Sequence, residues 1–226
     1  MMEEKPKQEQ GDRGEHEFTK PIVLAVEGAD EHFLIRALLA SEKLQGRMDF
    51  HPLKGNDNLP VKLTALRNTG NFRVFVSTLG VVIDAEEREV EDAISSVSNA
   101  LRAAFGCPLL PGPGVVMEWE GKPPRLGAFI LPDGQHPGSL EDLCLRAEAV
   151  RTDEAMECVD AYLKCLAPLL VDSTRALQSK RRLHAYLASR PTPGLKIGEA
   201  ATERCWHFED PVWAPLKQFL RDLVGA

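Results

Sequence analysis

The sequence lacks a hydrophobic run long enough to span a membrane, and it lacks any Cys-x-x-Cys pair. A membrane helix needs about 20 apolar residues, and the N-terminus has no apolar signal-peptide centre, so we expect a cytoplasmic protein without a membrane segment. The five cysteines are odd in number and widely spaced, which argues against a disulfide framework or a zinc knuckle. Cys158 and Cys165 follow a helical pattern and are expected on a buried helix face.

Several catalytic signatures are also missing. The glycines of PGPG belong to a predicted loop, because no G-x-G-x-x-G or Walker pattern follows a strand. There is no G-x-S-x-G nucleophile elbow, and the cysteines lack an arranged histidine. His136 and His184 have no partners at metal-binding spacing. These absences argue against P-loop nucleotide hydrolysis and against serine or cysteine nucleophiles.

Charge is present but unevenly distributed. The net charge of −7 at first argues against nucleic acid as a partner. However, residues 81–92 carry six acids against Arg88 alone, and residues 173–190 carry five cations and no acid. The cations of the second segment are Arg175, Lys180, Arg181, Arg182 and Arg190. Divalent cations suit the acidic segment and phosphate groups suit the basic one.

The order of the predicted elements indicates an α/β fold. Residues 1–19 are polar and aperiodic, so we expect a disordered tail. Buried strands in PIVLAV and RMDFHPL and before Asp84 alternate with helices, the first of them capped by Asp30 and packed through Phe33, Leu34, Leu38 and Leu39. Such alternation implies a mostly parallel sheet flanked by helices.

The rest of the chain is expected to be mostly helical. After a strand–turn–strand in VVMEWEGKPPRLGAFIL, helices are predicted at about 139–149, 154–170, 174–189 and 211–223. We therefore predict an α/β domain over residues 20–150 and a helical C-terminal extension over residues 151–226 that packs on it.

Carboxylates stand at the ends of the most hydrophobic strands. Glu27 follows the first strand and Asp84 ends a later one, and strand ends in a parallel sheet meet at one edge. Glu86 lies two residues beyond Asp84, and Glu31 lies one helical turn beyond Glu27, so both can face the same place. Carboxylates so crowded repel one another unless a cation neutralises them. Oxygen ligands without nearby His or Cys predict Mg²⁺ or Mn²⁺.

These segments resemble a known architecture. A glutamate–glycine step after the first strand and an Asp-x-Glu after a later one look like the TOPRIM domain of topoisomerases, bacterial primases and OLD-type nucleases. VEGADEHFL, LGVVIDAEE, LGAFILPDGQHPGSLEDLCL and LHAYLASRPTPGLKIGEAA are similar to segments of a family of small free-standing TOPRIM-like proteins with no assigned function. The resemblance spans residues 21–224. Glu86 departs from the usual pattern, because aspartate is common at that position.

The resemblance implies roles for individual residues. Glu27 would be the general acid/base, with Asp84 and Glu86 as the Mg²⁺-binding pair. Ser139 and Glu141 either belong to the capped start of a helix or complete a second metal site, as a similar segment does in OLD-type nucleases. Lys180 falls on the inward stripe of the basic helix with Ala176, Leu183 and Leu187, so it either snorkels from that face or reaches the acidic site to stabilise a phosphoryl transition state.

Three functions remain open at this stage. The first is a Mg²⁺- or Mn²⁺-dependent nuclease acting on DNA or RNA. The second is a catalytically weak metal- or nucleic-acid-binding effector that works with a separate ATPase partner. The third is a phospho-acceptor receiver-like domain, for which ILPDG offers little support. Strand passage by a topoisomerase mechanism is not expected, because Tyr162 and Tyr186 both lie in helices far along the chain.

Overall fold

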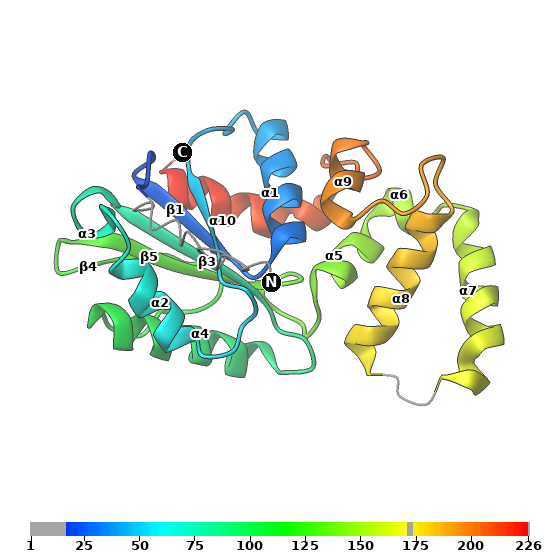
Figure 1. The fold of residues 1–226 in the computed structure, drawn as a ribbon, viewed down its shortest axis with the longest axis horizontal. Helices are drawn as coiled ribbons and strands as arrows, with labels where there is room; N and C mark the ends of the chain where they lie inside the picture. Colours follow the sequence, from blue (N-terminus) through cyan, green and yellow to red (C-terminus); the bar gives the residue numbers. More distant parts are fainter. Residues whose placement is uncertain (1–16, 171–173, 226) are drawn as a thin grey trace, which may run out of the picture.

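The computed structural model describes residues 17–170 and 174–225, and its core is a five-stranded sheet with strand order β2-β1-β3-β5-β4. The strands are β1 (Ile22–Val26), β2 (Asp49–Pro52), β3 (Thr78–Asp84), β4 (Val116–Trp119) and β5 (Lys122–Leu131). Only the β4–β5 pair is antiparallel. The predicted α/β class with a mostly parallel sheet is confirmed, and the strand before Asp84 lies at its centre (Figure 1).

Helices cover both faces of the sheet and continue beyond it. Those interleaved with the strands are α1 (Ala29–Ser41), α2 (Leu59–Arg67), α3 (Phe72–Phe75) and α4 (Val90–Phe105). Those after β5 are α5 (Leu140–Arg146), α6 (Glu148–Arg151), α7 (Ala155–Leu166), η1 (Ala167–Leu169), α8 (Arg175–Ala188), α9 (Ile197–Thr202), η2 (Pro211–Trp213) and α10 (Ala214–Val224). No helix in these two ranges of the chain is both long and apolar enough to cross a membrane.

Each central strand is buried on both sides because its alternate residues enter different cores. Val23 and Ala25 of β1 pack with α2 and α4, whereas Leu24 and Val26 pack with α1 and α10. β3 and β5 alternate in the same way. This double burial explains why the strands appear in the sequence as continuous apolar runs.

The last helix, α10, packs against the sheet face that α1 also covers. Its approach is close at Gly80 of β3, where an added Cβ would lie 2.6 Å from the Leu223 side chain and 2.7 Å from that of Leu24. Phe219 contacts Phe129 of β5 across the same interface, with ring centroids 5.7 Å apart. The C-terminal helices therefore complete the core of the α/β part.

Helices α7 and α8 form a hairpin that projects away from the sheet (Figure 1). Asp153, just before α7, accepts hydrogen bonds from Arg190 at 2.6 Å and from the Tyr186 hydroxyl at 3.2 Å. These bonds join the start of α7 to the end of α8. The base of the hairpin is therefore held by a polar cluster as well as by apolar packing.

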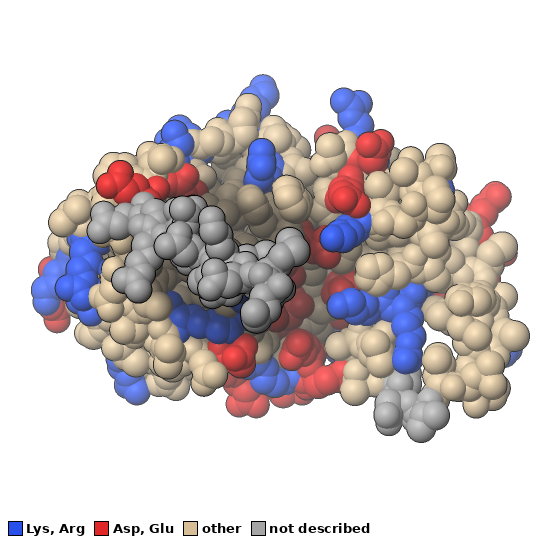
Figure 2. Space-filling model, in the orientation of Figure 1, with Lys and Arg blue, Asp and Glu red and all other residues tan. Residues whose placement is uncertain are grey.

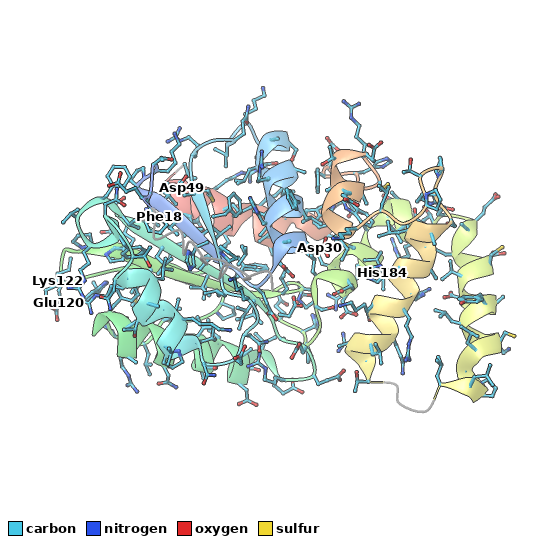
Figure 3. The ribbon with its side chains drawn as sticks, viewed as in Figure 1. Phe18, Asp30, Asp49, Glu120, Lys122 and His184 are labelled. Carbon is cyan, nitrogen blue, oxygen red and sulfur yellow. The ribbon has the colours of Figure 1, made fainter. Side chains whose placement is uncertain are left out.

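Four local predictions were wrong. Phe18 is buried and hydrogen-bonded to Asn71, and Thr19 is hydrogen-bonded to Asp49 (Figure 3), so the ordered part begins before residue 20. Residues 1–16 of the predicted tail lie outside the described residues. Cys158 and Cys165 are exposed, because only Met156 and Val159 of α7 are buried. Phe33 is 48% exposed. Helix α9 was not predicted at all.

Candidate functional site

A cleft of about 730 Å³ lies where the ends of β1 and β3 meet the N-termini of α1 and α5 and the side of α8. We call it the carboxylate cleft. Its lining includes all seven residues that the sequence singled out: Glu27, Glu31, Asp84, Glu86, Ser139, Glu141 and Lys180. In Figure 2, acidic side chains gather in a hollow between the α/β part and the hairpin, and basic side chains stand on the hairpin side.

Glu27 and Asp84 meet because their strands are parallel neighbours. Val26 of β1 is in register with Val82 of β3, so both strands end at the same edge. The backbone N–H of Asp84 donates to Glu27 Oε2 at 3.4 Å. Asp84 Oδ1 accepts the N–H of Leu140, the first residue of α5, at 3.0 Å. Asp84 thus connects the sheet edge to the start of α5.

Glu86 reaches the cleft from a turn rather than from the strand. β3 ends at Asp84, and Glu86 has a φ of 56°, in the left-handed region. Its N–H donates to the Gly138 carbonyl at 2.7 Å. Gly138 has a φ of 145°, and a Cβ there would lie 2.8 Å from Asp142 Oδ2. Strand alternation therefore does not explain the direction of Glu86, although the residue lines the cleft as expected.

Two of the predicted ligands also cap helices. Glu31 Oε2 accepts the N–H of Gly28, the N-cap of α1, at 2.8 Å. The N–H and Oγ of Ser139 donate to Asp142 Oδ2 at 2.9 and 3.2 Å at the start of α5. In both, the carboxylate of the third helical residue accepts the N–H of the N-cap residue, as one half of a capping box does. The capping interpretation of the α5 start is therefore confirmed, with Asp142 as its acid, while Ser139 and Glu141 still line the cleft.

Lys180 stands on the wall opposite most of the acids. The prediction that it shares the inward face of its helix was wrong: Leu183, Tyr186 and Leu187 form the buried face of α8, and Lys180 is exposed. His184, one turn further on, lines the same wall. The two nitrogen-bearing side chains of α8 that face the carboxylate cleft, Lys180 and His184, are thus separated by one helical turn.

A hydrogen bond holds α8 across the cleft. Glu87 Oε1 accepts the backbone N–H of Ala176, in the first turn of α8, at 2.8 Å. Carboxylates at this position complement the positive end of a helix. Glu87 therefore connects the β3–α4 loop to the hairpin.

The sequence did not identify several other residues of the lining. These are Asp30, Phe33, Thr174, Leu177, His184, Lys196 and Glu199, together with neighbouring backbone. Asp30 does not cap α1, since Gly28 is the N-cap; its Oδ1 accepts the N–H of Gly198 in α9 at 3.2 Å. Figure 3 labels Asp30 and His184, which come from different walls. Helical spacing from Lys180 could have indicated His184, but Lys196 and Glu199 depend on the unpredicted α9.

The carboxyl groups raise one another's pKa. The pKa of Asp84 is well above its ordinary value because of burial and then the charges of Glu31, Glu27 and Glu141. Burial raises the pKa of Glu27, and the charges of Glu31 and Glu86 raise it further, whereas the hydrogen bond from the Asp84 N–H lowers it. Like-charged groups held this close disfavour ionisation unless a cation is present.

The donor set fits a hard divalent cation in its chemistry. Among residues 17–170 and 174–225, no ion pair involves Glu27, Asp84 or Glu86, and the guanidinium of Arg88 bonds to the carbonyls of Asp84 and Ala85 rather than to carboxylates. In the same ranges, no three His, Cys, Asp or Glu side chains are already arranged to bind an ion together. Mg²⁺ commonly keeps several waters and uses only one or two carboxylates, which this cleft can supply.

Comparisons with known proteins place the chain in a family. Residues 21–225 match the family described as "Protein of unknown function (DUF3226)". The structure is similar to two structures of the C-terminal region of the Xanthomonas campestris pv. campestris OLD protein, phased with mercury (14% identity, TM-score 0.49) and with iodine (15%, 0.48). Each similarity covers 92% of this chain and 97% of the other. No curated protein sequence matches.

Proposed function

We propose that this chain, which belongs to the DUF3226 family, is a Mg²⁺- or Mn²⁺-dependent nuclease that cleaves phosphodiester bonds in DNA or RNA. The observation that supports this most is the convergence of five carboxylates and one lysine, chosen from sequence, on a single cleft. Burial, and then the neighbouring carboxyl groups, raise the pKa values of Glu27 and Asp84. A bound divalent cation would offset the repulsion among these carboxylates.

Asp84, Glu86 and Glu27 are the proposed ligands of the main ion. Asp84 is fixed by the Leu140 N–H, and Glu86 is fixed at its backbone by Gly138, so both side chains start from rigid points. When bound, a divalent cation supplies a Lewis acid that polarises the phosphoryl group and stabilises the leaving oxygen. Glu31, Ser139 and Glu141 line the adjoining part of the cleft and are the proposed contributors to a second ion site.

Glu27 is the proposed general base. Its carboxyl is partly buried and accepts the Asp84 N–H at 3.4 Å, which orients it beside the proposed ion site. Lys180 on the opposite wall is placed to face the anionic phosphate, where its ammonium group would offset the charge that develops in the reaction. His184 lies one turn away on the same wall and would add a hydrogen-bond donor toward the phosphate.

The test is cleavage of labelled single- and double-stranded DNA and RNA in Mn²⁺ or Mg²⁺, with EDTA as the metal-free arm. Asp84→Ala should lower the cleavage rate by at least about 100-fold, as expected when a group that stabilises transition-state charge is lost. Asp92→Ala is the matched control, because Asp92 is an exposed acid in the first turn of α4. It should cleave like the wild type.

The outcomes distinguish the nuclease from the metal- or nucleic-acid-binding effector. Cleavage that needs metal and Asp84 supports a nuclease. Metal binding without turnover on any of the four substrates would overturn the nuclease and favour the effector that works with an ATPase partner. Equal cleavage by wild type and Asp84→Ala would indicate a contaminating nuclease.

A further inference from the structure

A second cleft, of about 720 Å³, lies beside the carboxylate cleft between α5, α6, α7 and α8. Five arginines line it: Arg146, Arg151, Arg175, Arg181 and Arg182. Among the described residues, Asp142 is the one acid in its lining. We call it the arginine cleft. In a chain with a net charge of −7, such a concentration of guanidinium groups has to be explained.

Two of these arginines have partners that an anion can replace. Arg182 bonds to Asp160, whose side chain is 52% exposed, and exposed ion pairs of this kind contribute little to stability. Arg175 is itself exposed and lies 3.9 Å from the buried Asp142, too far for a hydrogen bond. Asp142 is held by its neighbours on α5 and α8, since its oxygens accept hydrogen bonds from Ser139 and from Ser179. Arg146, in contrast, is already bonded to Asp133.

Part of the remaining lining is apolar. Leu145 from α5, Leu163 from α7, Ala167 from η1 and Leu170 just beyond stand beside the polar Gln178 and Ser179 of α8. A free phosphate would make no use of such a surface. A nucleotide would, since its base can stack on apolar side chains and guanidinium planes while its phosphate binds the guanidinium edges.

The two clefts share their walls. α5 presents Leu140 and Glu141 to the carboxylate cleft and Leu145 and Arg146 to the arginine cleft. α8 presents Ala176, Leu177, Lys180 and His184 to the first, and Arg175, Gln178, Ser179, Arg181 and Arg182 to the second. A strand that crosses α8 therefore passes directly from the proposed site of cleavage to the arginines.

We propose that the arginine cleft binds a nucleotide unit of single-stranded nucleic acid next to the bond held in the carboxylate cleft. This inference rests on the proposed nuclease function, which makes the neighbouring carboxylate cleft the site of cleavage. A single strand is the ligand because its bases are free to leave the stack and contact the apolar lining, whereas the bases of a duplex are paired and stacked. The guanidinium groups bind its phosphates.

Binding is tested in EDTA, so that the result does not depend on cleavage. Fluorescence anisotropy measures the Kd of a labelled single-stranded oligonucleotide for the full chain and for Arg151→Ala/Arg175→Ala, two exposed arginines on different walls. We expect a Kd at least about 10-fold higher for the double variant. The slope of log Kd against log salt should fall by about 0.7 for each arginine lost.

Three controls identify the cause. Arg102→Ala removes an exposed arginine of α4 outside the cleft and should bind like the wild type. Arg151→Lys/Arg175→Lys keeps the charges, so it should keep the salt slope while losing affinity, because lysine cannot form the bidentate contact. An abasic strand, which keeps its phosphates, should bind at least about 5-fold more weakly than the normal strand.

The proposal is overturned if the double alanine variant, with an unchanged melting temperature, keeps the Kd and salt slope of the wild type. It is also overturned if a duplex of the same sequence binds as tightly as the single strand. A failure of the nuclease test would leave these binding results standing, because they are measured without metal or turnover. Conversely, if the wild type cleaves nucleic acid and the double variant binds the strand as tightly as the wild type does, only the proposed role of the arginine cleft is rejected.

Discussion

Replacing Asp84 by asparagine separates the charge of this side chain from its shape. The asparagine Oδ1 can still accept the Leu140 N–H, which lies 3.0 Å from Asp84 Oδ1. The buried carboxyl group, whose ionisation is disfavoured by burial and then by Glu31 and Glu27, is replaced by a neutral amide. We therefore expect Asp84→Asn in EDTA at pH 7 to melt at a higher temperature than the wild type.

Mn²⁺ should stabilise the wild type but not the variant. At a Mn²⁺ concentration 100 times its Kd, a ligand bound only by the folded state stabilises it by about 2.7 kcal/mol. For a chain of this size, each kcal/mol corresponds to roughly 2–4 °C, so the wild type should gain about 5–11 °C. Asp84→Asn should gain almost nothing.

Differential scanning calorimetry with and without Mn²⁺ measures both effects. Asp92→Asn, in the exposed first turn of α4, is the matched control and should keep the full metal shift. A wild type that does not respond to Mn²⁺, or an Asp84→Asn variant that responds equally, would refute the reasoning. A lower melting temperature for Asp84→Asn in EDTA would show that repulsion among the carboxylates does not destabilise the metal-free fold.

Two further substitutions test the scaffold around the clefts. The guanidinium of Arg190 lowers the pKa of Asp153, so this pair stabilises the fold above pH 3.8, the ordinary Asp pKa, and the contribution is lost as the pH falls below that value. Asp153→Asn should cost about 1–3 kcal/mol in urea unfolding at pH 7, with the difference shrinking in acid. Gly138→Ala, whose Cβ would clash with Asp142, should cost about 1–3 kcal/mol and weaken Mn²⁺ binding measured by titration calorimetry. Gly112→Ala, where the Cβ meets open space, should change neither.

An Asp153→Asn penalty that persists unchanged at pH 3 would show that the lost interaction is not the ion pair. Normal stability and Mn²⁺ affinity in Gly138→Ala would show that the turn at residue 138 does not position the cleft.

The parts of the fold that follow from local patterns could be predicted. β1 and β3 are continuous apolar runs between clear turn signals, and the capping serine marked the start of α5 correctly. The meeting of Glu27 with Asp84 followed from one rule, that parallel strands end at the same edge. These predictions needed no knowledge of distant contacts.

The remaining features depend on tertiary structure. Glu86 turns into the cleft because its backbone pairs with Gly138, 52 residues away. Helix α9 is six residues long, which is too short to show a helical period in the sequence. It is stabilised by packing on α1. Lys180 lies on the exposed part of α8 because this helix packs against α5 and α7 and buries Leu183 and Leu187, which helical spacing alone did not show.

The position of α10 also has a consequence for how the molecule is made. Leu223 fits against Gly80 in the centre of the sheet, so the part of this face that α10 covers stays exposed to solvent until residues 214–224 have left the ribosome. Until then, a nascent chain would expose apolar side chains of the central strands, and this core can be completed only after α10 has been synthesised.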